Sequence, residues 1–235
     1  MCGRYTLRTP LHVLAQQFLF ELGDLPADLE LKPRFNIAPT QTVAGIRRLE
    51  AGGARQLALF HWGLIPSWAK DAKLASSTIN ARGETLAEKP AFRTAFSRRR
   101  CLVLADGYFE WKAVGKKKQP LLFQLKSGQP FAFAGLWERW RGPEGTPPDS
   151  PPLESCTIVT TSANTLSANV HDRMPVILDP ADYDLWLDPA SEKERLLALL
   201  EPYPAELMQA EPVSMRVNNV RNDDPECIAA EKELF

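Results

Sequence analysis

The amino-acid sequence predicts one α+β domain built around antiparallel β-sheet. The chain has 235 residues, of which 44% are hydrophobic, and this is enough to bury one sizeable core. Short apolar or alternating segments, the pattern of β-strands, recur at roughly even spacing along most of the chain. A few helical patterns lie between them, which favours the α+β class.

The first predicted element is a helix over residues 9–22, TPLHVLAQQFLFEL. Thr9 is a suitable N-cap, and Pro10 suits the first helical position. Leu14 and Phe18 are among the apolar residues that recur at helical spacing, so we expect one face of this helix to pack on the core.

Strands are predicted where short apolar or alternating runs end at turn residues. Asp106-Gly107, for example, is a turn signal between the apolar run CLVLA and the alternating run YFEWK. The predicted strands cover residues 42–49, 54–62, 101–105, 108–112, 120–125, 131–137, 156–161 and 174–178. Further short helices are predicted at 90–96, 162–169 and 192–200.

Residues 142–152, GPEGTPPDSPP, contain seven Pro or Gly in eleven positions. Such a segment can link two domains. Strand signals of the same kind continue on both sides of it, however. We therefore predict a surface loop within a single domain that spans residues 1–235.

Composition excludes several classes of protein. The net charge of −1 rules out a strongly basic field over the whole molecule, so nucleic-acid binding would need a local patch. The four cysteines are far apart and include no CxxC pair, which argues against a zinc site and against a dense disulfide framework. The sequence shows no apolar signal segment and no membrane-spanning stretch. We expect a soluble cytoplasmic protein, associated with the nucleoid if bacterial, without metal or cofactor.

Cys2 follows the initiator methionine in the opening segment MCGRYT. Removal of Met1 would give Cys2 a free α-amine beside its thiol. An α-amine has a pKa of about 8, so a fraction of the amine groups is neutral and nucleophilic in the cell. Gly3 permits close backbone approach, and Arg4 supplies a cation that could lower the thiol pKa or hold an anion. The alternative is that Cys2 is a small apolar residue at a frayed terminus.

Asn80 and Arg82 lie two residues apart in STINARGET, so in an extended chain they point to the same side. An amide and a guanidinium on one face suit an oxygen-rich ligand such as a sugar with its phosphate. The alternative is the solvated polar end of a strand.

Glu110 lies in LADGYFEWK, where alternation places Phe109 and Trp111 on one face and Glu110 on the other. A carboxyl group flanked by aromatic side chains can have its pKa raised into the range of a general acid. The pattern alone instead favours Glu110 on a solvent-exposed face.

His171 is one of three histidines and lies in NVHDRMP. Asp172 and Arg173 follow it directly, which is typical neither of a core histidine nor of a metal ligand. Histidine titrates near neutral pH and can move protons.

Two groups of side chains suit single-stranded nucleic acid. HWGLIPSWAK places Trp62 and Trp68 near Pro and Gly residues, and an exposed loop tryptophan can stack on a base for about 1–3 kcal/mol. The basic runs at 97–100 and 115–118 could follow a phosphate backbone. For the lysine run at 115–118 a solvated turn is the preferred interpretation.

Eight segments occur in a characteristic order along most of the chain. They are MCGRY, RFNIAPTQ (34–41), WGLIPSW, INAR-E (79–84), ADGYFEWK, AGLW, TTSAN (160–164) and VHDRMPVIL. Together they resemble the SRAP family, whose members crosslink themselves to abasic sites in single-stranded DNA. The resemblance implies one α+β domain with a barrel-like antiparallel sheet, flanking helices and a basic DNA-binding groove.

The resemblance also implies roles for individual residues. The implied catalytic residues are Cys2, Asn80, Glu110 and His171. The implied DNA-binding residues are Arg4, Trp68, Arg82 and Arg173. Some relatives carry a second tryptophan where this chain has Ala69. The implied partner is single-stranded DNA containing abasic sites, bound by a monomer, with AP-lyase and autoproteolytic activity as further expectations.

These roles define a chemical mechanism. His171 transfers the proton that opens the sugar ring, the Cys2 amine adds to the aldehyde, and Glu110 is the acid for loss of water. The Cys2 thiolate then closes a thiazolidine, which is favoured because both nucleophiles belong to one residue. The alternatives are an N-terminal-nucleophile amidotransferase or peptidase, and a non-catalytic single-strand binder. The Asn-Gly-Glu motif typical of the amidotransferases is absent from the sequence.

Overall fold

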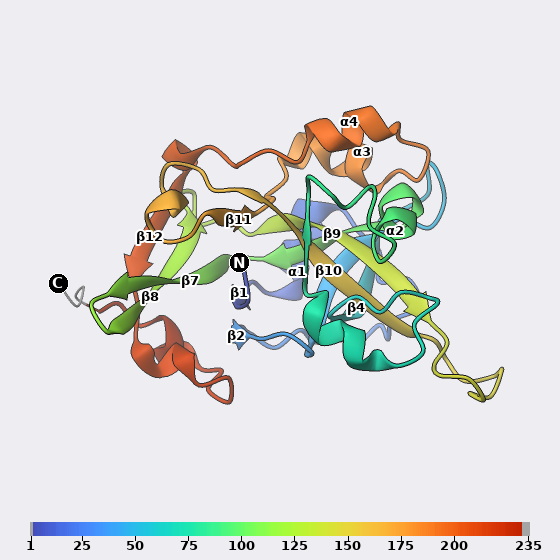
Figure 1. Cartoon of the computed structure of the whole chain (residues 1–235), viewed down its shortest axis with the longest axis horizontal. Helices are drawn as coiled ribbons and strands as arrows, with labels where there is room; N and C mark the ends of the chain where they lie inside the picture. The colour runs from blue at the N-terminus through green and yellow to red at the C-terminus, as the bar shows by residue number, and fades with distance from the viewer. Residues whose placement is uncertain (1, 232–235) are drawn as a thin grey trace.

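The computed structural model describes residues 2–231, which form two β-sheets with short helices around them (Figure 1). The strands are β1 (Tyr5–Leu7), β2 (Arg34–Ile37), β3 (Thr42–Arg47), β4 (Gln56–Trp62), β5 (Asn80–Arg82), β6 (Arg100–Ala105), β7 (Gly107–Val114), β8 (Lys117–Leu125), β9 (Phe131–Trp140), β10 (Leu153–Ser162), β11 (Arg173–Pro175) and β12 (Met208–Pro212). The α-helices are α1 (Leu11–Phe18), α2 (Arg93–Arg98), α3 (Tyr183–Leu187) and α4 (Lys193–Ala198). None of the helices within residues 2–231 is long and apolar enough to cross a membrane.

Five strands close into a barrel. The ring runs β10–β4–β3–β6–β9 and returns to β10, because β9 also pairs with β10. All pairs in the ring are antiparallel except β10–β4, which is parallel. Strand β5 continues the parallel pairing along β10, and β11 pairs with β10 antiparallel. The predicted α+β fold with a barrel is thus confirmed, and the two parallel pairings of β10 are a feature that the sequence did not predict.

The second sheet has the order β12–β8–β7–β1–β2 and is antiparallel throughout. It places the short strand β1, and with it the N-terminal end of the chain, next to β7 (Figure 1). Gly107 opens β7 where the chains approach closely, since a Cβ there would lie 2.9 Å from Thr6 Oγ1 and 2.9 Å from Leu122 Cδ1. This close approach requires glycine at the start of β7.

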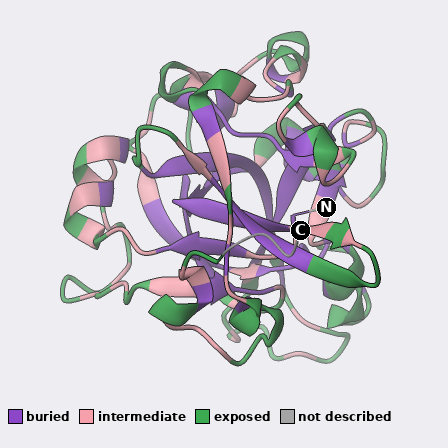
Figure 2. Cartoon of the chain, turned by 90° about the vertical axis from the view of Figure 1, so that its left-hand side faces the viewer, coloured by how far each residue is buried: buried purple, intermediate pink, exposed green. Residues whose placement is uncertain are grey.

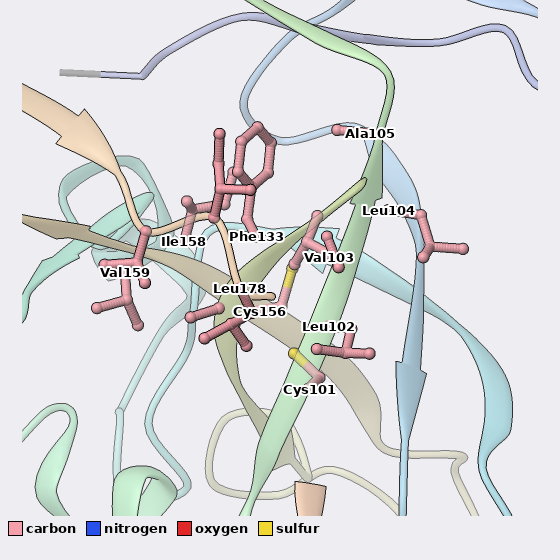
Figure 3. Packing of buried hydrophobic residues seen from close by; sticks show 14 of the residues in the cluster. Cys101, Leu102, Val103, Leu104, Ala105, Phe133, Cys156, Ile158, Val159 and Leu178 are labelled. Atoms are coloured by element: carbon pink, nitrogen blue, oxygen red, sulfur yellow. The ribbon is translucent and has the colours of Figure 1, made fainter. Parts of the chain in front are cut away.

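The main core is formed largely by residues of the strands, which are buried at the centre of the molecule (Figure 2). Figure 3 shows Val103 and Cys101 of β6 on the same side as Phe133 of β9 and Cys156 of β10, with Leu104 on the opposite side of the strand. Both thiols are free and fully buried. These two cysteines therefore act as small apolar residues of the core.

Most predicted elements form near the predicted positions, but several ends differ. Helix α1 stops at Phe18 because Leu19 adopts the left-handed conformation with φ of 52°. The predicted helix over 162–169 is reduced to one 3₁₀ turn, Ser167–Asn169. The strand predicted over 174–178 is regular only to Pro175. Residues 141–152 connect β9 to β10, which pair antiparallel from Trp140 and Leu153 onward.

Candidate active site

Strand β1 carries Cys2 to the middle of the molecule. The Phe109 amide donates to the Arg4 carbonyl oxygen at 3.0 Å, and Tyr5 is the register partner of Tyr108. Asp106 fixes the residues that follow β1, since its carboxylate accepts hydrogen bonds from Thr6 Oγ1 at 2.6 Å and from the Thr9 amide at 3.0 Å. The start of the chain is therefore held against β7, the strand that carries Glu110.

Cys2 is fully buried, and its thiol lies 3.9 Å from the Arg4 carbonyl oxygen that accepts from it. Burial raises the pKa of this thiol far above its ordinary value, and the nearby Glu110 carboxyl raises it further. The expectation that Arg4 lowers the thiol pKa is therefore wrong. The Arg4 guanidinium instead donates to Asn36 Oδ1 and to the Val217 carbonyl oxygen, each at 2.8 Å.

Asn80 contacts Cys2 directly. Its side-chain amide Nδ2 donates to the Cys2 carbonyl oxygen at 2.9 Å. The contact arises because β5 is extended along β10, with Ala81 fully buried and the flanking Asn80 and Arg82 facing the other way. The predicted alternation in this segment is confirmed.

Glu110 is only 5% exposed, so its placement on a solvent-exposed face is wrong. Strand β7 is covered on both faces. Tyr108 belongs to the main core, whereas Phe109 packs in a second cluster with Val213 and Val217. Burial raises the pKa of the Glu110 carboxyl above its ordinary value. The group is thus adapted to hold a proton at higher pH than an exposed glutamate.

His171 lies in the turn before β11, where two groups compete for its Nδ1 atom. The Arg173 backbone amide lies 3.0 Å from Nδ1, and Asp172 Oδ1 lies 2.8 Å from it. A neutral ring can accept from the amide only with its proton on Nε2, whereas an imidazolium ring can donate from Nδ1 to Asp172. The geometry therefore provides a partner for each charge state of His171.

Glu110 and His171 meet at an open pocket of about 590 Å³ beside Gly3, the residue after Cys2. It is lined by Gly3, Arg4, Glu110, Trp111, Lys118, His171 and Asn218. Sequence reasoning missed Lys118 and Asn218. Lys118 is exposed, as expected of the lysine run at 115–118, but the β7–β8 pairing brings it to the pocket rim. No sequence pattern marks Asn218, which accepts at Oδ1 from Trp111 Nε1 at 2.6 Å.

The predicted phosphate-binding arginines differ in their surroundings. Arg82 is exposed at the end of β5. Arg173 makes a two-pronged ion pair with Glu84 and also donates to the Thr160 carbonyl oxygen at 2.7 Å. This pairing lowers the pKa of the Glu84 carboxyl. The charge of Arg173 is therefore compensated in the structure, and Glu84 is a residue of the site region to which sequence reasoning gave no role.

The two tryptophans considered for base stacking behave differently. Trp68 is 60% exposed beside a hollow of about 460 Å³ that Lys70, Lys73 and Leu74 also line. Trp62 is fully buried, and its Nε1 donates to the Ile79 carbonyl oxygen at 2.9 Å. The prediction is wrong for Trp62 because that residue ends a barrel strand rather than lying in the loop.

Two further expectations concern the neighbourhood of Trp68 and the arginine run. Ala69 is buried, and its carbonyl oxygen accepts from Trp140 Nε1 at 2.7 Å, so its side chain adds nothing to the exposed face beside Trp68. In the run at 97–100, Arg100 is 2% exposed and donates to backbone carbonyl groups. Arg100 is therefore structural and does not follow a phosphate backbone.

Within residues 2–231 there is no group of three or more His, Cys, Asp or Glu side chains that could hold a metal ion. The pocket instead contains the buried Glu110 carboxyl group and the His171 imidazole, and its Gly3 follows Cys2, whose carbonyl oxygen accepts from Asn80. The fold is thus a closed five-stranded barrel with the start of the chain held beside a buried carboxyl group and an imidazole.

Comparison with known proteins identifies the family. Residues 1–220 match the family described as SOS response associated peptidase (SRAP). The chain belongs to this family, which confirms the resemblance. It is 43% identical over 230 residues to the abasic site processing protein YoqW of Bacillus subtilis, covering 97% of this chain and 99% of that protein. It is 35% identical over 202 residues to the abasic site processing protein HMCES of Xenopus tropicalis, covering 75% of this chain and 58% of that protein.

Solved structures also match the fold. A crystal structure of a protein from Bacteroides thetaiotaomicron superimposes with a TM-score of 0.85 at 26% sequence identity, covering 98% of this chain and all of that one. A protein from Bordetella bronchiseptica gives a TM-score of 0.73 at 28% identity and covers 91% of this chain.

Proposed function

We propose that this protein recognises abasic sites in single-stranded DNA and crosslinks itself to them through Cys2 after Met1 has been removed. The observation that carries the proposal is that four distant segments come together at Cys2 and at the pocket beside it. Asn80 holds the Cys2 carbonyl, while Glu110 and His171 line the pocket beside Gly3 and Arg4. The relatives named abasic site processing proteins support the choice of substrate.

Removal of Met1 is the first requirement of the mechanism. While Met1 is attached, the nitrogen of Cys2 is a non-nucleophilic amide. Its removal creates an α-amine beside the Cys2 thiol, which is neutral and fully buried. The Asn80 hydrogen bond to the Cys2 carbonyl then orients both nucleophiles toward the pocket.

The covalent steps use the remaining groups. The closed sugar opens to an aldehyde, and the neutral His171 ring presents its Nε2 proton because Nδ1 accepts from the Arg173 amide. The Cys2 amine adds to the aldehyde carbon, and the hydroxyl leaves as water after protonation by Glu110. The Cys2 sulfur then bonds to the same carbon and its proton is released, which closes the thiazolidine ring.

The thiol decides the fate of the intermediate. A Schiff base alone can eliminate the 3′ phosphate, so AP-lyase activity is the expected side reaction. Ring closure by sulfur removes the imine and preserves the strand. Loss of the thiol should therefore shift the protein from crosslinking toward strand cleavage.

The DNA-binding assignment rests on charge and exposure. Arg4 is held by neutral acceptors, and Arg82 and Trp68 are exposed. For Arg173 to hold a phosphate, that phosphate must replace Glu84 as the two-pronged partner.

The test is incubation of the purified protein with an abasic single strand, the same strand in a duplex and an undamaged single strand, followed by denaturing electrophoresis. We expect a covalent product with the abasic single strand, and much less with the duplex because Trp68 requires an unstacked base. Cys2→Ala should form no thiazolidine. A protein that binds all three DNAs without covalent product is a non-catalytic binder, and glutamine hydrolysis without DNA reaction would indicate an amidotransferase.

A further inference from the structure

We propose that Asn36 is a positioning residue that holds the Arg4 guanidinium on the C-terminal segment 214–224 and keeps its positive charge available to DNA phosphate. The inference rests on the proposed function for the role of Arg4. It concerns a residue outside the pocket lining and a segment in which sequence reasoning found no function.

Asn36 links Arg4 to this segment through its side-chain amide. It is fully buried on β2, and its Oδ1 accepts from Arg4 Nη1 at 2.8 Å. Its Nδ2 group faces three backbone carbonyl oxygens, those of Val217 at 3.1 Å, Asn219 at 3.1 Å and Asn222 at 2.7 Å. One amide thus fixes both the guanidinium and the chain that curves around it.

The segment is anchored independently of Arg4. Asp223 Oδ1 accepts from the backbone amides of Phe35 at 2.5 Å and Asn36 at 2.9 Å. Val217 is fully buried in the cluster that contains Phe109, the residue before Glu110 in β7. The segment is therefore a fixed wall beside the pocket, and its Val217 carbonyl provides the second acceptor for Arg4.

Both acceptors of Arg4 are uncharged, and this distinguishes it from Arg173. Arg173 faces the Glu84 carboxylate, which compensates its charge. Arg4 faces an amide oxygen and a peptide carbonyl, which orient the guanidinium while leaving its net charge in place. Arg4 also lines the pocket, so the oriented charge lies where substrate would bind. A neutral asparagine at position 36 is therefore required, and a carboxylate there would neutralise Arg4.

The experiment is a double-mutant cycle on binding to an undamaged single strand, so that no covalent step enters. Dissociation constants are measured across a range of salt concentrations for wild type, Arg4→Ala, Asn36→Ala and the double variant. Loss of one phosphate contact should reduce the slope of log affinity against log salt by about 0.7. We expect Asn36→Ala to weaken binding and flatten the slope much as Arg4→Ala does, and to add little in the Arg4→Ala background. A purely structural Asn36 would lower the melting temperature but leave the slope unchanged, or would add its full effect in the double variant.

A second variant covers the case in which Asn36→Ala fails to fold. Asn36→Asp has nearly the same volume and keeps an acceptor for Arg4, but it adds the charge that the proposal forbids. It should bind DNA at least as weakly as Arg4→Ala, and wild-type affinity with a wild-type salt slope would overturn the proposal.

Nitrogen NMR of the Arg4 guanidinium measures the contact between Arg4 and Asn36 without DNA. We expect slow rotation in wild type and fast rotation in Asn36→Ala, and equal rotation in both would refute the inference. Absence of DNA binding by wild type would refute only the proposed function.

Discussion

The side-chain amide of Asn80 donates a hydrogen bond of 2.9 Å to the carbonyl oxygen of Cys2. This contact joins a strand on the barrel to the first residues of the chain. It also leaves the Cys2 nitrogen and sulfur free of Asn80, so the amide can orient the nucleophiles without occupying them. The rate of crosslinking should therefore depend on Asn80 more strongly than DNA affinity does.

Asn80→Ala removes the donor, and Asn80→Asp replaces it with an acceptor that faces the Cys2 carbonyl. One neutral hydrogen bond contributes about 1 kcal/mol, so we expect Asn80→Ala to slow crosslinking roughly fivefold to tenfold. Asn80→Asp should be slower still. Single-turnover rates on an abasic strand, with affinity for an undamaged strand as the control, test this. An affinity loss as large as the rate loss would show that Asn80 binds DNA instead.

Glu110→Gln should slow crosslinking by about 10²–10⁴-fold, the usual contribution of a positioned acid. The substitution is close to isosteric, so packing cannot account for such a loss. Part of the rate should return under acidic conditions, where solvent can supply the proton. A wild-type rate at neutral pH would remove Glu110 from the mechanism.

The same substitution should stabilise the fold at neutral pH. Burial raises the pKa of Glu110, so the native state binds more protons than the unfolded state between the unfolded and the folded pKa. Wild-type stability therefore falls as pH rises from the unfolded pKa through the folded pKa, whereas a glutamine side chain has no proton to lose. Melting curves should show a stabilising effect of Glu110→Gln that grows with pH and disappears below the unfolded pKa. A stability difference that does not change with pH would contradict the raised pKa.

His171→Ala should slow reaction with an abasic site far more than reaction with an open-chain aldehyde on the same strand. The reason is that His171 is assigned to ring opening, and the open-chain substrate has no ring. Crosslinking rates on the two substrates test the assignment. Equal defects would leave His171 in the site but exclude the ring-opening role.

Glu84→Gln should strengthen DNA binding. The Glu84 carboxylate pairs with Arg173, and its removal frees the guanidinium for a phosphate. Glu88→Gln is the matched control, because Glu88 is exposed nearby and loses the same charge. We expect a severalfold larger gain for Glu84→Gln than for Glu88→Gln in the wild-type background, and no difference between them in an Arg173→Ala background. Equal gains in wild type would mean that only net charge matters.

The individual strands were predictable from local pattern, but their closure into a barrel was not. Apolar runs such as CLVLA form β6 almost as predicted, since a buried strand needs only short-range signals. The parallel pairing of Cys156 on β10 with Trp62 on β4 joins residues far apart in sequence, and no local signal specifies it. For the same reason, the burial of Trp62 could not be predicted from its own segment.

The site shows a similar division. Cys2, Asn80 and His171 stand out by residue type and spacing. In the structure Asn80 contacts Cys2, and His171 lines the pocket beside Gly3. The burial of Glu110 was not predictable from alternation. Alternation assigns one solvent-exposed face to strand β7, whereas both faces of this strand are covered. Tyr108, on the same face as Glu110, belongs to the main core, whereas Phe109 on the opposite face packs against Val217 from a segment with no periodic pattern.

The most direct test of the central claim is the intact mass of the product formed with an abasic single strand, before and after borohydride treatment. The proposed chemistry predicts the mass of the chain without Met1 plus the strand, less one water, with peptide mapping to Cys2. It also predicts that borohydride leaves this mass unchanged, because a thiazolidine has no imine to reduce. A covalent product on protein that retains Met1, a product on another residue, or an adduct that borohydride reduces would contradict the account.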